Sequence, residues 1–159
     1  MTALPSRSGD ADVRVGAYAT LVDEQERILL ALWNECPAPA WTLPGGGVEQ
    51  DETPERAAVR EAREETGYDI ELLRLLGEDA FTVPPSERTG GARRPLRSIR
   101  LVFEARVVGG TLTDEAGGTT DRAAWIPLAE VAGLERVPLV DIALRLLSGA
   151  RSGGRAGER

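Results

Sequence analysis

Apolar stretches alternate with short polar segments along the chain, and this alternation predicts a series of strands. Residues 13–22 (VRVGAYATLV) and 27–33 (RILLALW) are strongly apolar, and the polar segment DEQE separates them. Apolar runs of this length, bounded by turn residues, are typical of buried strands. The same pattern predicts further extended segments at residues 41–44, 69–76, 79–83, 99–108 and 123–126.

A helix is predicted after a run of three glycines. Thr53 can cap its first turn, and Pro54 fits the first helical position. Gly67 stands where a helix needs a residue in the left-handed conformation at its C-terminal end. The residues on the core-facing side of this helix would be small and apolar, which would let the helix lie close to a sheet.

Strands interleaved with helices indicate an α/β sandwich with a mixed β-sheet. Two further helices are predicted at residues 128–132 and 138–147. With 159 residues, the chain is most simply one domain, which we place at residues 13–147. We expect residues 1–12 to be a flexible lead-in. Residues 148–159 (SGARSGGRAGER) are rich in glycine, serine and arginine, which predicts a disordered tail.

The composition excludes several kinds of chemistry. All 19 basic residues are arginines, and there is no histidine. Histidine-dependent nucleophiles, His-ligated zinc, lysine Schiff bases and a Walker-type lysine are therefore excluded. The net charge of −7 argues against nonspecific binding to nucleic acid. We also expect no membrane span, no signal peptide and, with Cys36 as the single cysteine, no internal disulfide, which together predict a cytoplasmic protein.

Three glutamates on the predicted helix are the strongest candidates for chemistry. Glu61, Glu64 and Glu65 are spaced i, i+3 and i+4, so they project within one narrow sector of a helix. Like charges in that arrangement repel by about 0.2–0.5 kcal/mol per pair. The cluster therefore does not stabilise the helix, and it suggests a divalent cation, since Mg²⁺ and Mn²⁺ take oxygen ligands.

The segment that holds these glutamates resembles the signature of the Nudix hydrolase family, G-x5-E-x7-R-E-U-x-E-E-x-G-U, where U is an apolar residue. Here Gly46 begins the motif, Glu52 follows after five residues, and REAREETGY (residues 60–68) follows after seven more. Every glycine and charged position matches. Tyr68 departs from the aliphatic residue that is more usual there, which should affect packing more than chemistry. The segment WIPLAEV (residues 125–131) is also similar to the family.

The resemblance implies a Nudix-type α/β/α sandwich and a MutT-like activity. The implied reaction is hydrolysis of the pyrophosphate bond of a nucleoside diphosphate linked to another moiety, with Mg²⁺ or Mn²⁺ as cofactor. A nucleotide, a nucleotide sugar, ADP-ribose and an oxidised deoxynucleoside triphosphate all stay open as substrates. The alternative is a catalytically silent Nudix module that binds a nucleotide and regulates a partner. The family also contains many dimers, so a homodimer stays open.

By position in the motif, the implied catalytic residues are Glu52, Arg60, Glu61, Glu64 and Glu65. The implied metal ligands are Glu61, Glu64 and Glu65, together with the carbonyl of Gly45. Arg60 is expected to orient the glutamates through charge-assisted hydrogen bonds. Glu52 or one of the three ligands would help to deprotonate or orient water.

Two regions outside the motif contain further candidates. Family members often use an additional acid from a later loop, and Glu115 and Asp121 both stand in such a position; we expect Glu115 as a further metal ligand, although spacing does not decide between the two. The segment 88–100 contains five arginines and no acid, which suits phosphate binding. The candidates for contact with a small nucleotide-type substrate are Arg93, Arg94 and Arg97. The alternative is a solvated loop whose arginines pair with nearby acids.

Overall fold

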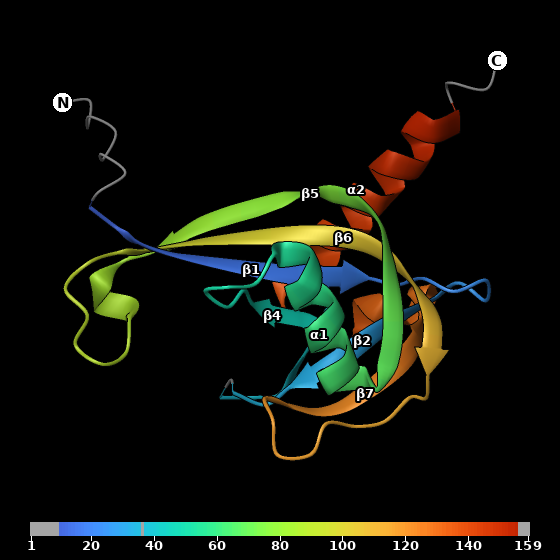
Figure 1. Ribbon diagram of the computed structural model, residues 1–159, viewed down its shortest axis with the longest axis horizontal. Helices are drawn as coiled ribbons and strands as arrows, with labels where there is room; N and C mark the ends of the chain where they lie inside the picture. The colour runs from blue at the N-terminus through green and yellow to red at the C-terminus, as the bar shows by residue number, and fades with distance from the viewer. Residues whose placement is uncertain (1–9, 36, 156–159) are drawn as a thin grey trace.

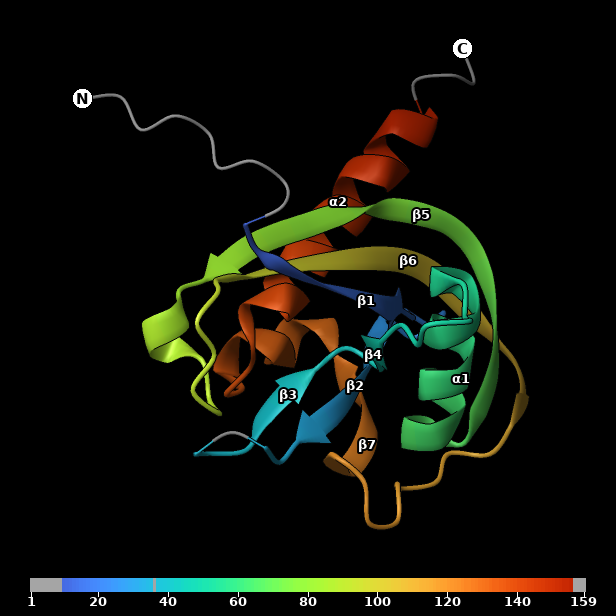
Figure 2. The same ribbon diagram turned by 60° about the vertical axis from the view of Figure 1, so that its left-hand side comes forward.

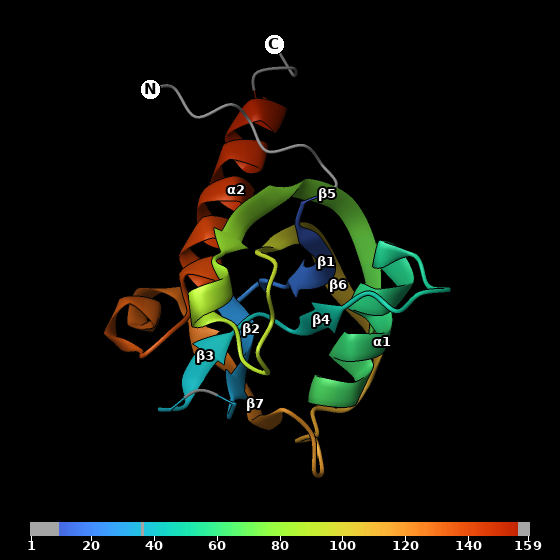
Figure 3. The same ribbon diagram turned by 90° about the vertical axis from the view of Figure 1, so that its left-hand side faces the viewer.

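The computed structural model describes residues 10–35 and 37–155, so most of the predicted lead-in, Cys36 and the last four residues lie outside the described part. Two β-sheets lie between two helices, which cover opposite sides of the strands (Figures 1 and 3). The elements, in chain order, are β1 (Asp12–Thr20), β2 (Arg27–Trp33), β3 (Ala40–Thr42), β4 (Gly45–Gly47), α1 (Pro54–Thr66), β5 (Tyr68–Val83), η1 (Pro85–Glu87), β6 (Leu96–Gly110), β7 (Thr120–Pro127), η2 (Leu128–Gly133) and α2 (Pro138–Arg155).

The larger sheet is mixed, as the sequence predicts. Its strand order is β4-β1-β6-β5; β1 and β6 are parallel, and β4 and β5 are antiparallel to their neighbours. The smaller sheet has the order β3-β2-β7 and is antiparallel throughout. Helix α1 packs against β1, β4 and β5, and α2 contacts β1, β3 and β5. The predicted α/β sandwich is therefore confirmed, with a second, smaller sheet that the sequence pattern did not reveal.

Strand β5 is one continuous strand where the sequence predicts two. Its pairing with β6 shifts register between Asp69 and Ile70, and twice more farther along the strand. Such bulges bend a strand and interrupt the alternation of apolar and polar side chains, which is why the sequence suggests a break. Gly77 follows the last bulge; a Cβ there would lie 3.0 Å from Leu146 Cδ2 of α2, so the glycine lets α2 approach the strand closely.

Helix α1 begins and ends at the predicted residues. The Thr53 hydroxyl accepts a hydrogen bond from Arg56 N (3.3 Å), and the Gly67 amide donates to Arg63 O (2.9 Å). Gly67 has φ of 80°, and a Cβ there would lie 2.2 Å from Thr111 O, so this position requires glycine. The side of α1 that faces the sheet carries three fully buried alanines, Ala57, Ala58 and Ala62, and their small size brings the helix close to the strands.

The predictions for the two ends of the domain need correction. Helix α2 does not end at residue 147 but continues to Arg155, so residues 148–155 are helical rather than disordered. Adding residues to a formed helix is easier than starting one, and Arg151 Nη2 lies 3.6 Å from Glu104 Oε1 of β6. At the other end, β1 already begins at Asp12, whose amide donates to Pro95 O (2.9 Å).

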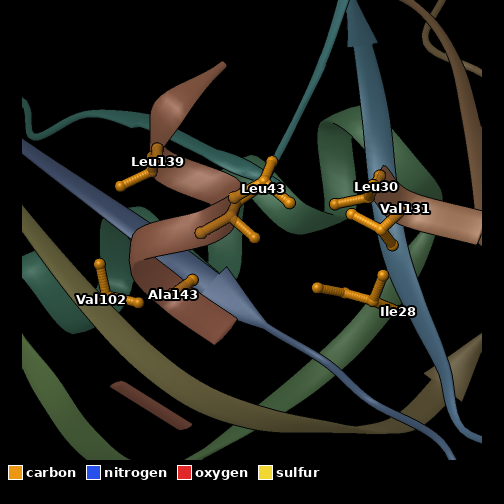
Figure 4. Packing of buried hydrophobic residues seen from close by; sticks show 8 residues of the cluster. Ile28, Leu30, Leu43, Val102, Val131, Leu139 and Ala143 are labelled. Atoms are coloured by element: carbon orange, nitrogen blue, oxygen red, sulfur yellow. The ribbon is translucent and has the colours of Figure 1, made fainter. Parts of the chain in front are cut away.

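The main core lies between β2, β6, η2 and α2, where apolar side chains from distant parts of the chain point toward one another (Figure 4). Its buried members include Ile28, Leu30, Leu43, Val102, Val131, Leu139 and Ala143. Tyr68 packs elsewhere: its hydroxyl accepts a hydrogen bond from Trp125 Nε1 (3.0 Å), which gives this departure from the motif a packing role. In the described part of the chain, no helix is both long and apolar enough to cross a membrane.

Candidate active site

The three glycines of β4 form an edge strand of the larger sheet, and β4 lies next to both β1 and α1 (Figure 2). Next to the glycines, Ala19 N donates to Pro44 O (2.8 Å), and Val48 N donates to Val15 O (2.9 Å). In an antiparallel pair, alternate residues of a strand form hydrogen bonds with its partner. The first and last glycines of β4 therefore direct their backbone polar groups away from β1, toward the free edge of the sheet.

The contacts at this free edge connect β4 to the predicted site. Gly45 N donates to Glu65 Oε2 (3.0 Å), and Gly47 O accepts from Arg60 Nη2 (3.3 Å). By the same alternation, the carbonyl of Gly45 is directed to the edge at which Glu65 lies. The geometry is therefore consistent with the predicted role of that carbonyl as a ligand.

The middle glycine allows α1 to approach the strand. A Cβ at Gly46 would lie only 2.7 Å from Glu61 Oε1 and 2.8 Å from its Cδ. Any side chain at this position would displace the Glu61 carboxylate from its place beside the strand. The first glycine of the motif therefore has a steric function, which is to make room for a glutamate.

Glu65 is the most unusual carboxyl group of the site, because only 3% of the residue is exposed. Burial raises its pKa to about 9; the hydrogen bond from the Gly45 amide opposes this effect, and the charges of Glu61 and Glu115 add to it. A buried carboxylate with a single amide donor is unstable in the ionised form unless a positive charge compensates it. Glu61, which is partly buried, also has a pKa raised by burial, although Arg60 opposes the shift.

Arg60 connects the carboxylates of the motif. Its Nε and Nη2 donate to the two oxygens of Glu52 (2.6 and 2.8 Å), and its Nη1 donates to Glu61 (3.1 Å) and to Glu64 (3.4 Å). The bidentate bond lowers the pKa of Glu52 to about 2. These are the contacts that the expected orienting role requires, since one guanidinium fixes three of the carboxylates relative to the glycine strand.

The donor set suits a hard divalent cation. Glu61, Glu64, Glu65 and the Gly45 carbonyl offer only oxygen atoms, which Mg²⁺ and Mn²⁺ prefer. Within the described part of the chain, no three acidic, histidine or cysteine side chains converge on one point as a ready-made metal site. The guanidinium of Arg60 lies among the carboxylates instead. The side chain of Glu64 is 48% exposed, so it has room to change rotamer when a cation binds.

The two candidate acids of the later loop lie in different surroundings. Glu115 accepts hydrogen bonds from Thr120 N (3.2 Å) and Thr120 Oγ1 (2.8 Å), and its charge is near enough to raise the pKa of Glu61 and of Glu65. Asp121 is exposed and accepts a hydrogen bond from the side-chain amide of Asn34. The electrostatic contact with the motif therefore favours Glu115 as the additional acid.

A cavity of about 340 Å³ extends from the glutamates along the inner face of the larger sheet. Glu61, Glu65 and the glycines of β4 are among its lining residues, and we call these residues the acidic wall. Strands β1, β5 and β6, which belong to the same sheet as β4, contribute a second set of lining residues, which we call the strand wall: Arg14, Gly16, Tyr18, Phe81, Ser98 and Arg100. Trp33 and Thr42 of the smaller sheet also line the cavity.

Arg100 is held rigidly in the strand wall. Its Nε donates to Asp79 Oδ2 (3.0 Å), its Nη2 donates to the same oxygen, and its guanidinium carbon lies 4.8 Å from the centre of the Phe81 ring. Asp79 is directly opposite Arg100 in the pairing of β5 with β6, so the sheet register creates this arrangement. Arg100 therefore presents a fixed, charge-compensated surface to the cavity.

The predicted phosphate-binding arginines are not brought to this cavity. Arg93, Arg94 and Arg97 are exposed and lie outside its lining. Arg94 lies 3.6 Å from Asp12, which also binds Arg88 (2.8 Å). For these two arginines, the alternative of pairing with a nearby acid agrees with the structure.

The arginines that do line the cavity are Arg14 and Arg100. Arg100 belongs to the arginine-rich segment 88–100 but was not one of the three candidates named from it, and sequence reasoning did not assign Arg14 to the site. Arg14 shares a face of β1 with Gly16 and Tyr18. The alternation of residues along this strand is the feature of the sequence that could have placed Arg14 on the same face as these two cavity residues.

The comparison with protein families agrees with this site. The family model of the NUDIX domain matches residues 12–145, which is most of the chain. The chain belongs to the Nudix hydrolase family. The resemblance drawn from the motif is thereby confirmed, and so is the fold class that it implied.

The matches between this Nudix protein and its relatives differ in extent. It is 30% identical to the RNA pyrophosphohydrolase of Marinomonas sp. (strain MWYL1), with 80% of this chain and 86% of that protein covered. It is 34% identical to a MutT-like protein of Streptomyces ambofaciens, with 87% and 78% covered. The chain spans only 40% of the length of a Bacillus subtilis (strain 168) relative and 54% of a Mycobacterium tuberculosis (strain CDC 1551 / Oshkosh) relative.

Solved structures show the same Nudix fold. A Nudix hydrolase from Nitrosomonas europaea superposes with a TM-score of 0.73 at 22% identity, over 87% of this chain and 90% of that one. A MutT Nudix hydrolase from Burkholderia pseudomallei gives a TM-score of 0.66 at 29% identity, over 85% and 98%. The first of these likenesses concerns the fold alone, because its sequence identity is low.

Proposed function

We propose that this Nudix protein hydrolyses the pyrophosphate bond of a nucleoside diphosphate linked to another moiety, with Mg²⁺ or Mn²⁺ as cofactor. The observation that carries the proposal is the buried carboxyl of Glu65. It is held by the Gly45 amide at the free edge of the glycine strand and lies within electrostatic range of Glu61 and Glu64. A structural role alone does not explain why a helix places two carboxylates, those of Glu61 and Glu65, against a strand that has no side chains.

In the proposed mechanism, Glu61, Glu64, Glu65 and the Gly45 carbonyl would hold the cation, and Glu115 would extend this set from the later loop. When bound, the cation would neutralise phosphate charge and lower the pKa of a water molecule. Arg60 hydrogen-bonds to Glu61, Glu64 and the carbonyl of Gly47, and so holds the two carboxylates near β4. Because the pKa of Glu52 is held low, Glu52 stays ionised at neutral pH and anchors Arg60.

The cavity agrees with a small nucleotide-type substrate. Its volume of about 340 Å³ lies within the range typical of small-molecule sites, roughly 300–1,000 Å³. Three aromatic residues line it, Tyr18, Trp33 and Phe81, and aromatic rings suit contact with a base. The names of the relatives, which include an RNA pyrophosphohydrolase, are consistent with pyrophosphate chemistry on nucleotides.

The proposal is tested by hydrolysis assays with Mg²⁺ and a panel of nucleoside triphosphates, dinucleotides, nucleotide sugars and ADP-ribose. Wild type is compared with Glu64→Gln, Glu65→Gln and the matched control Glu55→Gln, which changes an exposed glutamate in the first turn of the same helix. We expect turnover by wild type and by the control, and loss of turnover in the two site variants. If wild type hydrolyses nothing but binds a nucleotide, the chain is a silent binding module. If the site variants equal wild type, the proposed site is wrong.

A further inference from the structure

Two arginines line the cavity, and they differ in whether an acidic side chain pairs with their charge. Arg100 is compensated by Asp79 and covers Phe81. Arg14 also lines the cavity, but within the described part of the chain no hydrogen bond or ion pair compensates its guanidinium. The chain has a net charge of −7, so most of its surface should repel an anionic ligand. The unpaired guanidinium of Arg14 is a place where an anionic group of a ligand could bind favourably.

Arg14 lies next to the glycine strand, on the face opposite to α1. A Cβ at Gly47 would lie 3.5 Å from Arg14 Nη2 and 3.7 Å from its Nε, whereas a Cβ at Gly46 would meet Glu61. Successive residues of a strand point to opposite faces, so the guanidinium and the glutamates lie on the two sides of one thin strand. A ligand that reaches across the free edge of β4 would meet the carboxylate cluster first and Arg14 next.

We propose that Arg14 binds a phosphate group that adjoins the scissile diphosphate, so that nucleoside triphosphates are the preferred substrate class of this site. The inference rests on the proposed function and makes it more specific. Guanidinium is well suited to the several oxygens of a phosphate, which it can bind in a bidentate manner. The uncharged hydroxyl groups of a nucleotide sugar or of ADP-ribose would form no comparable charge-assisted hydrogen bond with Arg14, which is an exposed residue.

The test measures equilibrium binding in the Glu64→Gln background, so that turnover does not consume the ligand. Calorimetry with Mg²⁺ compares ATP, GTP, CTP and UTP with ADP and ADP-ribose. The test variant is Arg14→Gln. The control is Arg97→Gln, which makes the same charge change one position away in the pairing of β1 with β6, at an exposed residue outside the cavity lining. Arg14→Lys then shows whether a point charge alone is sufficient.

We expect Arg14→Gln to weaken the binding affinity for the tightest-binding triphosphate by about 10-fold or more, which is the usual effect of a lost charge-assisted hydrogen bond. ADP and ADP-ribose should change by less than about twofold, Arg14→Lys should restore only part of the affinity, and Arg97→Gln should bind like the parent. An equal loss for all ligands, or no loss, would overturn the proposal, as would a parent that binds none of the four triphosphates. Since binding is measured without hydrolysis, failure of this inference and failure of the proposed function are separate results.

Discussion

The two walls of the cavity are built in different ways. The acidic wall comes from one continuous stretch, β4 and α1 with the turn between them, and Arg60 links its Glu61 to the neighbouring Glu52 and Glu64. The strand wall combines side chains from β1, β5 and β6, which are far apart in the sequence and meet only through sheet register. The difference suggests a division of labour. The acidic wall would supply the reaction, which depends on local geometry, and the strand wall would decide which molecule is placed against it.

The largest effect is expected in the acidic wall. Glu65→Gln should lower kcat by about 100-fold or more for every substrate that wild type accepts, because loss of a metal ligand should exceed the roughly 10–100-fold typical of outer-shell partners. Steady-state kinetics with two unrelated substrates measures this. A loss confined to one substrate would show that Glu65 belongs to substrate selection and would break the proposed division.

The next effect concerns the residue that joins the acidic wall. Arg60→Gln should lower activity by about 10–100-fold and raise the Mg²⁺ concentration needed for half-maximal activity, because Glu52, Glu61 and Glu64 lose their common partner. A Mg²⁺ titration of the activity of both proteins checks this. An unchanged Mg²⁺ requirement would contradict the orienting role.

The buried carboxyl of Glu65 should also affect stability in the absence of metal. Its pKa of about 9 in the folded protein lies above the ordinary value of 4.5, so between these values the folded state holds a proton that the unfolded state has lost. The stability of the metal-free protein should therefore fall as the pH rises from about 5 to 9. In Glu65→Gln this fall should be smaller. Thermal unfolding in EDTA at several pH values measures both slopes, and equal slopes would contradict the burial argument.

The strand wall should show smaller effects that depend on the substrate. Phe81→Leu removes the ring under Arg100, an interaction worth about 0.5–1 kcal/mol at a partly exposed site, so KM should rise by roughly two- to fivefold while kcat is nearly unchanged. Kinetics with several nucleotides tests this. A fall in kcat that is uniform across substrates would place Phe81 with the acidic wall instead.

The smallest effect is expected where the sequence suggested a large one. Arg93→Gln should leave kcat and KM within about twofold of wild type, as is usual for surface substitutions away from a site. Kinetics under the same conditions as for Phe81→Leu gives the comparison. A clear rise in KM would bring residues 88–97 into the substrate site and enlarge the strand wall.

The two walls also explain how far the sequence could predict the site. The caps of α1 and the grouping of Glu61, Glu64 and Glu65 depend on short spacings along one segment, so the motif displays them directly. Arg14 carries no local signal. Its place in the cavity depends on the parallel pairing of β1 with β6, which is a contact between residues more than 80 positions apart.

The arginine-rich segment shows why composition alone was misleading. A concentration of positive charge suggested phosphate binding, but Asp12 of β1 lies beside two of these arginines because Leu96 of β6 is paired with it. Helix α2 is a similar case. The glycines and serines after residue 147 suggested disorder, whereas the helix is already fixed by its packed first turns and continues.

The most direct test of the central claim, that the glutamates of α1 form a divalent-cation site, is Mn²⁺ binding followed by electron paramagnetic resonance. We expect wild type and the control Glu55→Gln to bind Mn²⁺ with the same affinity, and Glu65→Gln and Glu64→Gln to bind it at least about tenfold more weakly. If all four proteins bind Mn²⁺ equally, or if wild type binds none, the account of this site is wrong.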